Sequence, residues 1–401
     1  MKLNLDKYLL YSSVFSIFSE GFFFNFIIDW KLLYLIIFVN YFLIIKYKTL
    51  RVHKTFLIVV ASLFAHAILC YTIIQIPPNY FISQLLGITI TGLYFYNFFL
   101  VSDLSKVTKL YLSLSFYVAI IGLIFYFIGF NPLSYFTDDG RLMSIFKEPA
   151  HYVVVILPAC YFFLRNKLFL KFFILFISII LSESSLGYIG CGLMFIFPFF
   201  NLKRIKYLLI AVPLVMTAFF YTYKNFESFQ MRVDDSVDNL TVLKNGKFDD
   251  ATNLSSYVIL SNMYIAKQNI IEHPFGSGIG SHHYMFTTRY HKTMRPPSYI
   301  RELDQTFDNS FDANSLFTRI SSELGIIGII CVIFFIVRSF YLSFSNSDYI
   351  LQGILIYFLL KLLRDGTYFP PELFFFFWMF YFSIKKLFLH KTKQTLRCIG
   401  L

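Results

Sequence analysis

Residues 224–313 read KNFESFQMRVDDSVDNLTVLKNGKFDDATNLSSYVILSNMYIAKQNIIEHPFGSGIGSHHYMFTTRYHKTMRPPSYIRELDQTFDNSFDA. This stretch decides the fold, because it is the long polar segment of a chain that is otherwise almost continuously apolar. It holds 11 of the 23 acidic residues and four of the eight histidines. Chemistry that needs water and charged side chains is therefore expected in this segment.

The composition outside this stretch is that of a membrane protein. Hydrophobic residues make up 57% of the chain, charged residues 14%, and the mean hydropathy is +0.64. Soluble globular proteins carry about 25% charged residues. We predict an all-α polytopic membrane protein, because helices satisfy their own backbone polar groups in hydrocarbon.

Runs of roughly 20 apolar residues are long enough to cross a bilayer as helices. They predict about twelve transmembrane helices, near 8–28, 30–46, 55–76, 80–100, 107–130, 149–164, 168–183, 185–200, 205–223, 314–342, 348–364 and 370–388. The alternative for the first two is one long hairpin or a shifted pair. The chain is thereby divided into a first membrane region (1–223, with a short outer loop at 131–148), a large loop (224–313) and a second membrane region (314–401) that ends in a basic tail.

Basic residues predict the orientation of these helices. With the N-terminus inside, 20 Lys and Arg fall in cytoplasmic segments and five in the short outer loops. This distribution places both termini in the cytoplasm and the large loop outside. The net charge of +12 is then explained by the cytoplasmic face near anionic lipid, and no nucleic-acid partner is expected.

The loop contains a predicted amphipathic helix at 252–272, with Thr252 or Asn253 as its cap and Pro274 beyond its end. That helix is expected either to lie on the membrane surface or to pack on the ends of the spans. Next come Gly276, Gly278 and Gly280 at alternate positions. They predict a tight turn. Its amides face an anion or a sugar hydroxyl, or its glycines serve the turn alone.

The segment after this turn is basic. Residues 274–300 contain no acid, but they contain His282, His283, Arg289, His291, Lys292 and Arg295. Such a segment suits a phosphate or diphosphate ligand, and a solvated basic surface is the alternative.

Two other outer segments carry polar groups. Arg141 stands in a short outer loop, where it either pairs with Asp138 or Asp139 or has a function of its own. Glu148 and His151 lie about one helical turn apart at the start of the sixth predicted helix, where ionisable residues often mark a cavity.

Past the large loop, Asp312 and Asn314 lead into a helix that contains Arg319 and Glu323. The four-residue spacing of Arg319 and Glu323 predicts a structural ion pair.

Together these segments resemble the O-antigen polymerase and O-antigen ligase superfamily. The resemblance rests on the layout with one late outer loop, on Gly140-Arg141 to Glu148-Pro149, on the Pro274 to Gly280 turn, and on Asp312-Ala313-Asn314 followed by Glu323-Leu324-Gly325. It implies a helical membrane fold similar to the GT-C type, in the inner membrane of a bacterium.

The resemblance also implies a glycosyltransferase that uses an undecaprenyl-diphosphate-linked oligosaccharide and no cofactor. Polymerases of the superfamily move the growing chain onto a lipid-linked repeat unit, whereas ligases move it onto lipid A-core. Ligases usually have His-Asn where this chain has Ala313-Asn314. This departure favours the polymerase. A chain-length regulator is left open as a further protein partner.

The reaction suggests roles for particular residues. Positioned arginines stabilise a leaving diphosphate, so Arg141, Arg232 and Arg289 are the predicted binding residues. Gly278, Gly280 and Asn314 are predicted to complete the substrate site. The candidate general bases, in falling order, are His282, His283, Glu148 and Asp312. Because neither Asp-x-Asp nor His-Glu-x-x-His occurs in the sequence, we predict metal independence.

Other functions are less well matched by the sequence. A lipid-linked oligosaccharide flippase or other polysaccharide transporter is expected to place its cations inside a central cavity and to have short loops on both sides. A membrane acyltransferase is expected to carry a His-Asp signature within a span.

Overall fold

The computed structural model describes the chain except for residues 1–3, 27, 131–139, 201–207, 226, 228–229, 232, 235–240, 346–347 and 399–401. Its apolar helices are, in chain order, α1 (Leu5–Ser16), α2 (Leu32–Tyr47), α3 (Lys54–Ile74), α4 (Pro78–Val101), α5 (Leu104–Phe127), α6 (Pro149–Arg165), α7 (Phe169–Leu181), α8 (Ser185–Ile196), α9 (Leu208–Asn225), α15 (Leu316–Ser345), α16 (Tyr349–Leu363) and α17 (Pro371–Cys398).

These helices coincide with the predicted spans from the second one onward, and the helical membrane fold is confirmed. Among the described residues, α3, α4, α5 and α15 are long and apolar enough to cross a membrane. Five further apolar helices are shorter: α2, α6, α7, α16, and α8 together with the 3-10 turn η1 (Phe197–Phe199). The count of twelve spans stays a prediction.

The first predicted span, 8–28, is wrong as a continuous helix. Helix α1 ends at Ser16, and strands β1 (Phe23–Phe26) and β2 (Ile28–Lys31) form an antiparallel hairpin. The hydroxyls of Ser16 and Ser19 donate to the carbonyls three residues earlier. Such bonds compete with the helical ladder. The chain turns here, and Glu20 reaches a partner on another helix.

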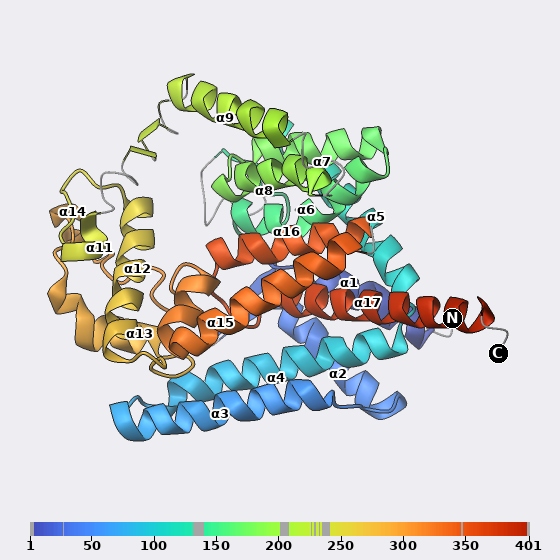
Figure 1. Ribbon diagram of the computed structural model, residues 1–401, viewed down its shortest axis with the longest axis horizontal. Coiled ribbons are helices and arrows are strands. Elements are labelled where there is room, and N and C mark those ends of the chain that lie inside the picture. The colour runs from blue at the N-terminus through green and yellow to red at the C-terminus, as the bar shows by residue number, and fades with distance from the viewer. Residues whose placement is uncertain are drawn as a thin grey trace.

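The bundle is organised around α16. It packs against α6, α8, α15 and α17, and nearly all of its side chains are buried. Figure 1 shows the α3–α4 pair on one side of the central helices and α6–α8 on the other. The lobe built from residues of the large loop lies at one end of the bundle, and both ends of the chain lie at the opposite end. Which of these ends faces the cytoplasm stays a prediction.

The lobe contains α11 (Val242–Asn245), α12 (Leu254–Glu272), α13 (His282–Tyr284), the π-helical turn η4 (Met285–Tyr290), η5 (His291–Thr293) and α14 (Ser298–Glu302). Asn253 caps α12, because its side chain accepts a hydrogen bond from the amide of Ser256 at 2.9 Å. Of the two predicted placements, α12 adopts the packed one, against α15. Ile265, Met285, Phe286 and Tyr290 form a small core with Ile76 just beyond α3. The lobe is therefore attached to two separate parts of the bundle.

Candidate functional site

The glycine turn docks into a break in α15. Gly325 has φ +60, which interrupts the helix, and the amide of the next residue, Ile326, donates to the carbonyl of Pro274 at 2.9 Å. A Cβ on Gly276 would lie 2.3 Å from the Glu323 carbonyl oxygen, and one on Gly280 would lie 2.3 Å from the Tyr80 carbonyl oxygen. Only glycine fits such approaches at positive φ. The turn is therefore a wedge between α4 and α15.

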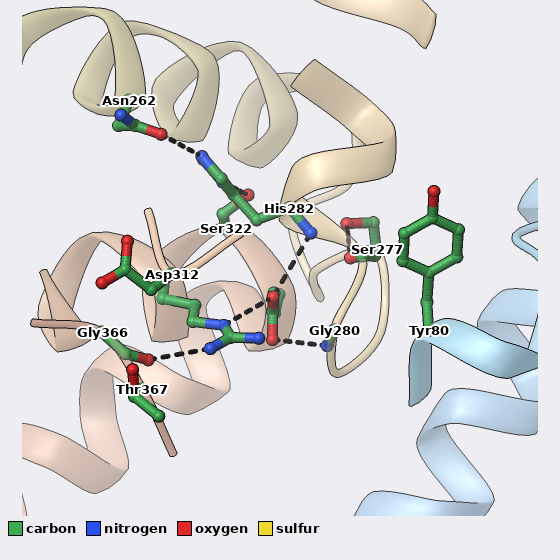
Figure 2. Close-up of polar contacts among 12 residues, drawn as sticks. Tyr80, Asn262, Ser277, Gly280, His282, Asp312, Ser322, Gly366 and Thr367 are labelled. Atoms are coloured by element: carbon green, nitrogen blue, oxygen red, sulfur yellow. Dashed lines mark hydrogen bonds and ion pairs between the residues drawn. The ribbon is translucent and has the colours of Figure 1, made fainter. Parts of the chain in front are cut away.

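The anion that meets this turn is the carboxylate of Glu323. Its Oε2 accepts from the Gly280 amide at 2.7 Å, and its Oε1 accepts from the His282 amide at 3.3 Å and from Arg319 Nε at 3.0 Å (Figure 2). The Gly278 amide donates to the Glu323 carbonyl at 2.9 Å. Contact of Gly278 and Gly280 with substrate stays a prediction, and their amides have intramolecular partners.

Arg319 and Glu323 form the predicted pair, and it is buried: their side chains are 3% and 0% exposed. Arg319 also donates to the carbonyl of Gly366 at 3.0 Å, and its guanidinium lies 4.3 Å from the centre of the Tyr368 ring. Each charge is thus hydrogen-bonded as well as paired, which is what a buried pair requires. The pair joins α15, the glycine turn and the connection between α16 and α17.

His282 belongs to the same buried network. Its Nε2 donates to Asn262 Oδ1 at 3.0 Å, since the amide nitrogen of Asn262 donates elsewhere. Its Nδ1 lies 2.9 Å from Ser322 Oγ, and the side chain is fully buried. Burial, followed by the charge of Arg319, lowers the pKa of His282 to about 3. The imidazole is neutral and holds the lobe onto α15 in Figure 2.

His283 points to a different part of the lobe. Its Nδ1 lies 2.7 Å from Ser310 Oγ, and that hydroxyl donates to the carbonyl of Phe307 at 2.6 Å. Nδ1 is therefore the protonated nitrogen and Nε2 is left as an acceptor. The ring is half-buried and stacks on Phe311 with centroids 3.6 Å apart. Burial lowers its pKa.

Asp312 and Asn314 follow directly after Phe311. One carboxylate oxygen of Asp312 accepts from the Asn314 amide at 3.0 Å, and the side chain is partly exposed. Burial and the nearby charge of Asp365 raise the pKa of Asp312, while Arg319 and Lys361 oppose this. The carbonyl of buried Asn314 accepts from the Asp365 amide at 3.0 Å. The carboxylate of Asp312 is thus partly open to solvent and has a raised pKa.

Two of the three predicted arginines, Arg141 and Arg289, are among the described residues. Arg289 is half-exposed and pairs with Glu272 at 2.8 Å. The segment after Arg141 packs on the membrane helices: Leu142 donates to the carbonyl of Leu181, and Ser144 to that of Val118. Arg232 lies outside the described residues. Convergence of the three on one diphosphate stays a prediction.

His151, which the sequence singled out, belongs to a second charged cluster whose other members, Glu20 and Lys31, were not predicted. His151 Nδ1 lies 2.8 Å from Glu20, whose carboxylate also approaches Lys31 at 3.6 Å. The signal was an acid inside an apolar run, since such residues usually have a partner. Glu148 stands at the N-cap of α6, one turn before His151, without capping the helix.

Lys361 and Asp365 form an ion pair at the end of α16. Burial would raise the pKa of Asp365, but the cations of Lys361 and His151 hold it well below its usual range. This pair follows the four-residue rule and was readable from the sequence. Since Asp365 also bonds Asn314, it connects the Glu20 cluster to Asp312.

The comparisons with known proteins bear on the same region. Residues 170–333 match a protein family described as O-Antigen ligase. The resemblance to the O-antigen polymerase and ligase superfamily is confirmed. No curated protein matches the chain.

The matching segment covers less than half of the chain, but it includes the whole lobe and the broken part of α15. It supports an enzyme with an O-antigen ligase-like or polymerase-like function, a lipid-linked glycan substrate and a multi-pass membrane setting. It ends within α15, so the segments that hold Arg141, Glu148 and Asp365 lie outside it.

Proposed function

We propose that this protein is a polysaccharide polymerase. It transfers a growing glycan from undecaprenyl diphosphate onto a lipid-linked repeat unit at the outer face of the inner membrane. The observation that carries the proposal is the position of Asp312: a partly exposed carboxylate with a raised pKa, beside the buried Arg319–Glu323 pair where the lobe meets the membrane helices.

Asp312 is the proposed general base. It takes the proton of the acceptor hydroxyl as that oxygen attacks the anomeric carbon of the donor. The bond between this carbon and the phosphate oxygen breaks, and undecaprenyl diphosphate leaves with the electron pair. A base with a pKa nearer neutrality is more effective, since it is ionised at working pH and still binds a proton well.

The other base candidates are less suitable. His282 is buried with both ring nitrogens occupied. Glu148 lies at the start of α6, next to His151 and its partner Glu20. His283 keeps an acceptor nitrogen and stacks beside Asp312 on the same segment of the loop. We therefore assign His283 to substrate binding and Asp312 to proton transfer.

The leaving diphosphate needs positive charge, and we retain Arg141, Arg232 and Arg289 for this role. The ion pair between Arg289 and Glu272 lies at the surface, so replacing Glu272 by another anion costs little free energy. A phosphate that displaces Glu272 gains a charge-assisted hydrogen bond. The proposed transfer needs no metal ion, so activity on purified lipid-linked repeat units is expected to survive EDTA.

A ligase is the second candidate, because the matching family is described by that activity. The presence of Ala313, where ligases of the superfamily usually have histidine, favours the polymerase. Both activities need the same setting at the outer face of the membrane.

Deletion of the gene distinguishes the two. Loss of the long-chain ladder with one repeat unit retained on lipid A-core supports the polymerase. Loss of every repeat unit contradicts it and indicates a ligase or a flippase. Complementation with the wild-type gene is the control, and restoration of the ladder by an Asp312→Asn variant would refute the assigned base.

A further inference from the structure

Phe311 is an exposed aromatic ring that is held in a fixed orientation. Its side chain is 68% exposed, although one face is covered by the imidazole of His283 at a centroid distance of 3.6 Å and an angle of 14°. A single exposed ring is common on a protein surface, but this one is fixed by the stacked imidazole, so its open face can accept a ligand without the cost of ordering a side chain. The covered face leaves the opposite face as the one available to a ligand.

The support under this ring is built from buried groups. His283 is fixed through Nδ1 by Ser310, which is fully buried and donates in turn to the carbonyl of Phe307. On its other side, His283 lies 6.3 Å from the ring of Tyr80, at the start of α4. The stack is therefore anchored to both the lobe and the membrane helices.

The segment that carries the ring is acidic, which disfavours a phosphate packed directly against the ring. Residues 302–312 contain Glu302, Asp304, Asp308 and Asp312 and no Lys, Arg or His. Carboxylates repel phosphate but accept hydrogen bonds from hydroxyl groups. Hydrocarbon is equally unsuited to such a neighbourhood, because unpaired carboxylates are costly to bring into a membrane.

A pyranose ring matches both properties. The C–H groups on one face of a sugar ring pack against an aromatic face, which carries partial negative charge. Its hydroxyl groups can donate to the carboxylate of Asp312, the next residue in the chain, and to Nε2 of His283. An apolar face with hydroxyl donors at its edge is thus complementary to an aromatic face with acceptors at its edge.

We propose that the exposed face of Phe311, supported by His283, is a binding subsite for one pyranose ring of the glycan. This inference rests on the proposed function, because it assumes that the lobe handles a glycan. It places a sugar against the ring that directly precedes Asp312, the proposed base.

The test uses the full-length protein in detergent and the host's repeat-unit oligosaccharide, released from its carrier lipid, as the probe. The variants are Phe311→Leu, which keeps apolar bulk, and Phe311→Tyr, which keeps the ring. The matched control is Phe127→Leu at the end of α5, where the phenylalanine is 74% exposed. Binding is measured by saturation transfer from the protein to the sugar C–H protons, and folding by thermal unfolding.

Phe311→Leu is expected to weaken oligosaccharide binding about tenfold, while Phe311→Tyr and Phe127→Leu bind like the wild type. Equal binding by Phe311→Leu and the wild type overturns the inference, and so does equal weakening by Phe311→Leu and Phe127→Leu. These results are separate from the deletion test. A deletion strain that keeps its ladder refutes the polymerase, whereas unchanged binding by Phe311→Leu refutes only the sugar subsite.

Discussion

Two neighbouring parts of the site use polar residues in opposite ways. Both carboxylate oxygens of Glu323 accept hydrogen bonds. The guanidinium of Arg319 forms an ion pair with Glu323, donates to a backbone carbonyl and lies over the Tyr368 ring. Both charged side chains are buried. Around Phe311 and Asp312, the side chains are partly exposed, and burial raises the pKa of Asp312 and lowers that of His283. The first part holds the lobe in place, and the second leaves polar side chains partly open to solvent.

The difference shows that burial separates structure from chemistry better than residue type does. His282 and His283 are adjacent in sequence, yet one is a neutral core residue and the other faces the loop surface. A fully satisfied charge has no capacity left for a reacting group. Variants around Glu323 are therefore expected to lower the melting temperature, whereas variants around Asp312 are expected to lower the transfer rate.

The largest effect is expected for Glu323→Ala. It leaves Arg319 buried without its partner and the amides of Gly280 and His282 without an acceptor. Breaking a buried pair in this way costs about 3–5 kcal/mol. The expected result is loss of folded protein, measured as yield and as melting temperature in detergent. Glu302→Ala, at the exposed end of α14, is the control and should unfold like the wild type. A Glu323→Ala variant that folds normally but lacks activity would contradict the assignment of Glu323 to the part that holds the lobe in place.

The next largest effect is expected for Asp312→Asn, and it is on the transfer rate, not on stability. The amide keeps the size of the side chain and removes the base, so the transfer rate should fall about 100-fold or more with little change in melting temperature. Because the pKa of Asp312 is raised, the wild-type rate should decline on the acid side at a pH above 3.8.

The control for that variant is Asp103→Asn, which keeps a capping residue at the start of α5. Rates are measured by chain extension with purified lipid-linked repeat units. An Asp312→Asn variant with a wild-type rate would remove Asp312 from the mechanism. Unfolding of this variant would place Asp312 in the structural part of the site.

The last effect is the smallest per pH unit: it is a pH dependence of the free energy of unfolding that comes from His282. Its pKa is about 3 in the folded protein, against an ordinary value of 6.5. Between these values the unfolded chain binds the proton and the folded chain does not. Stability is therefore full above pH 6.5 and falls as the pH drops toward 3, by at most about 1.4 kcal/mol per pH unit.

This slope is measured from melting temperatures across that range. His282→Gln should reduce it, although the variant is less stable overall because the buried hydrogen bonds change. His283→Gln is the matched control, since His283 is only half-buried, and it should leave most of the slope. Equal slopes for the wild type and His282→Gln would show that His282 is not the neutral core residue described above.

Several features followed from the sequence because their causes are local. The apolar runs predicted the helices from α2 onward, Asn253 and Pro274 marked the ends of α12, and the spacing of Arg319 and Glu323 predicted their pair. The first predicted span was wrong because serine hydroxyls and Glu20 break an apolar run whose average composition suits a helix. The ligand of the glycine turn escaped prediction for a different reason: its carboxylate lies 43 residues away in the chain.

The sequence by itself determined a helical membrane protein with one polar lobe and the superfamily to which its motifs point. Hydropathy and spacing are properties of neighbouring residues. In a bilayer an apolar run forms a helix, because a helix satisfies its own backbone polar groups. The tertiary structure alone decided that Glu323 binds the glycine turn, that Asp365 joins Asn314, and that Phe311 rests on His283. Those contacts depend on packing between distant segments, and packing is what separates a satisfied charge from a reactive one.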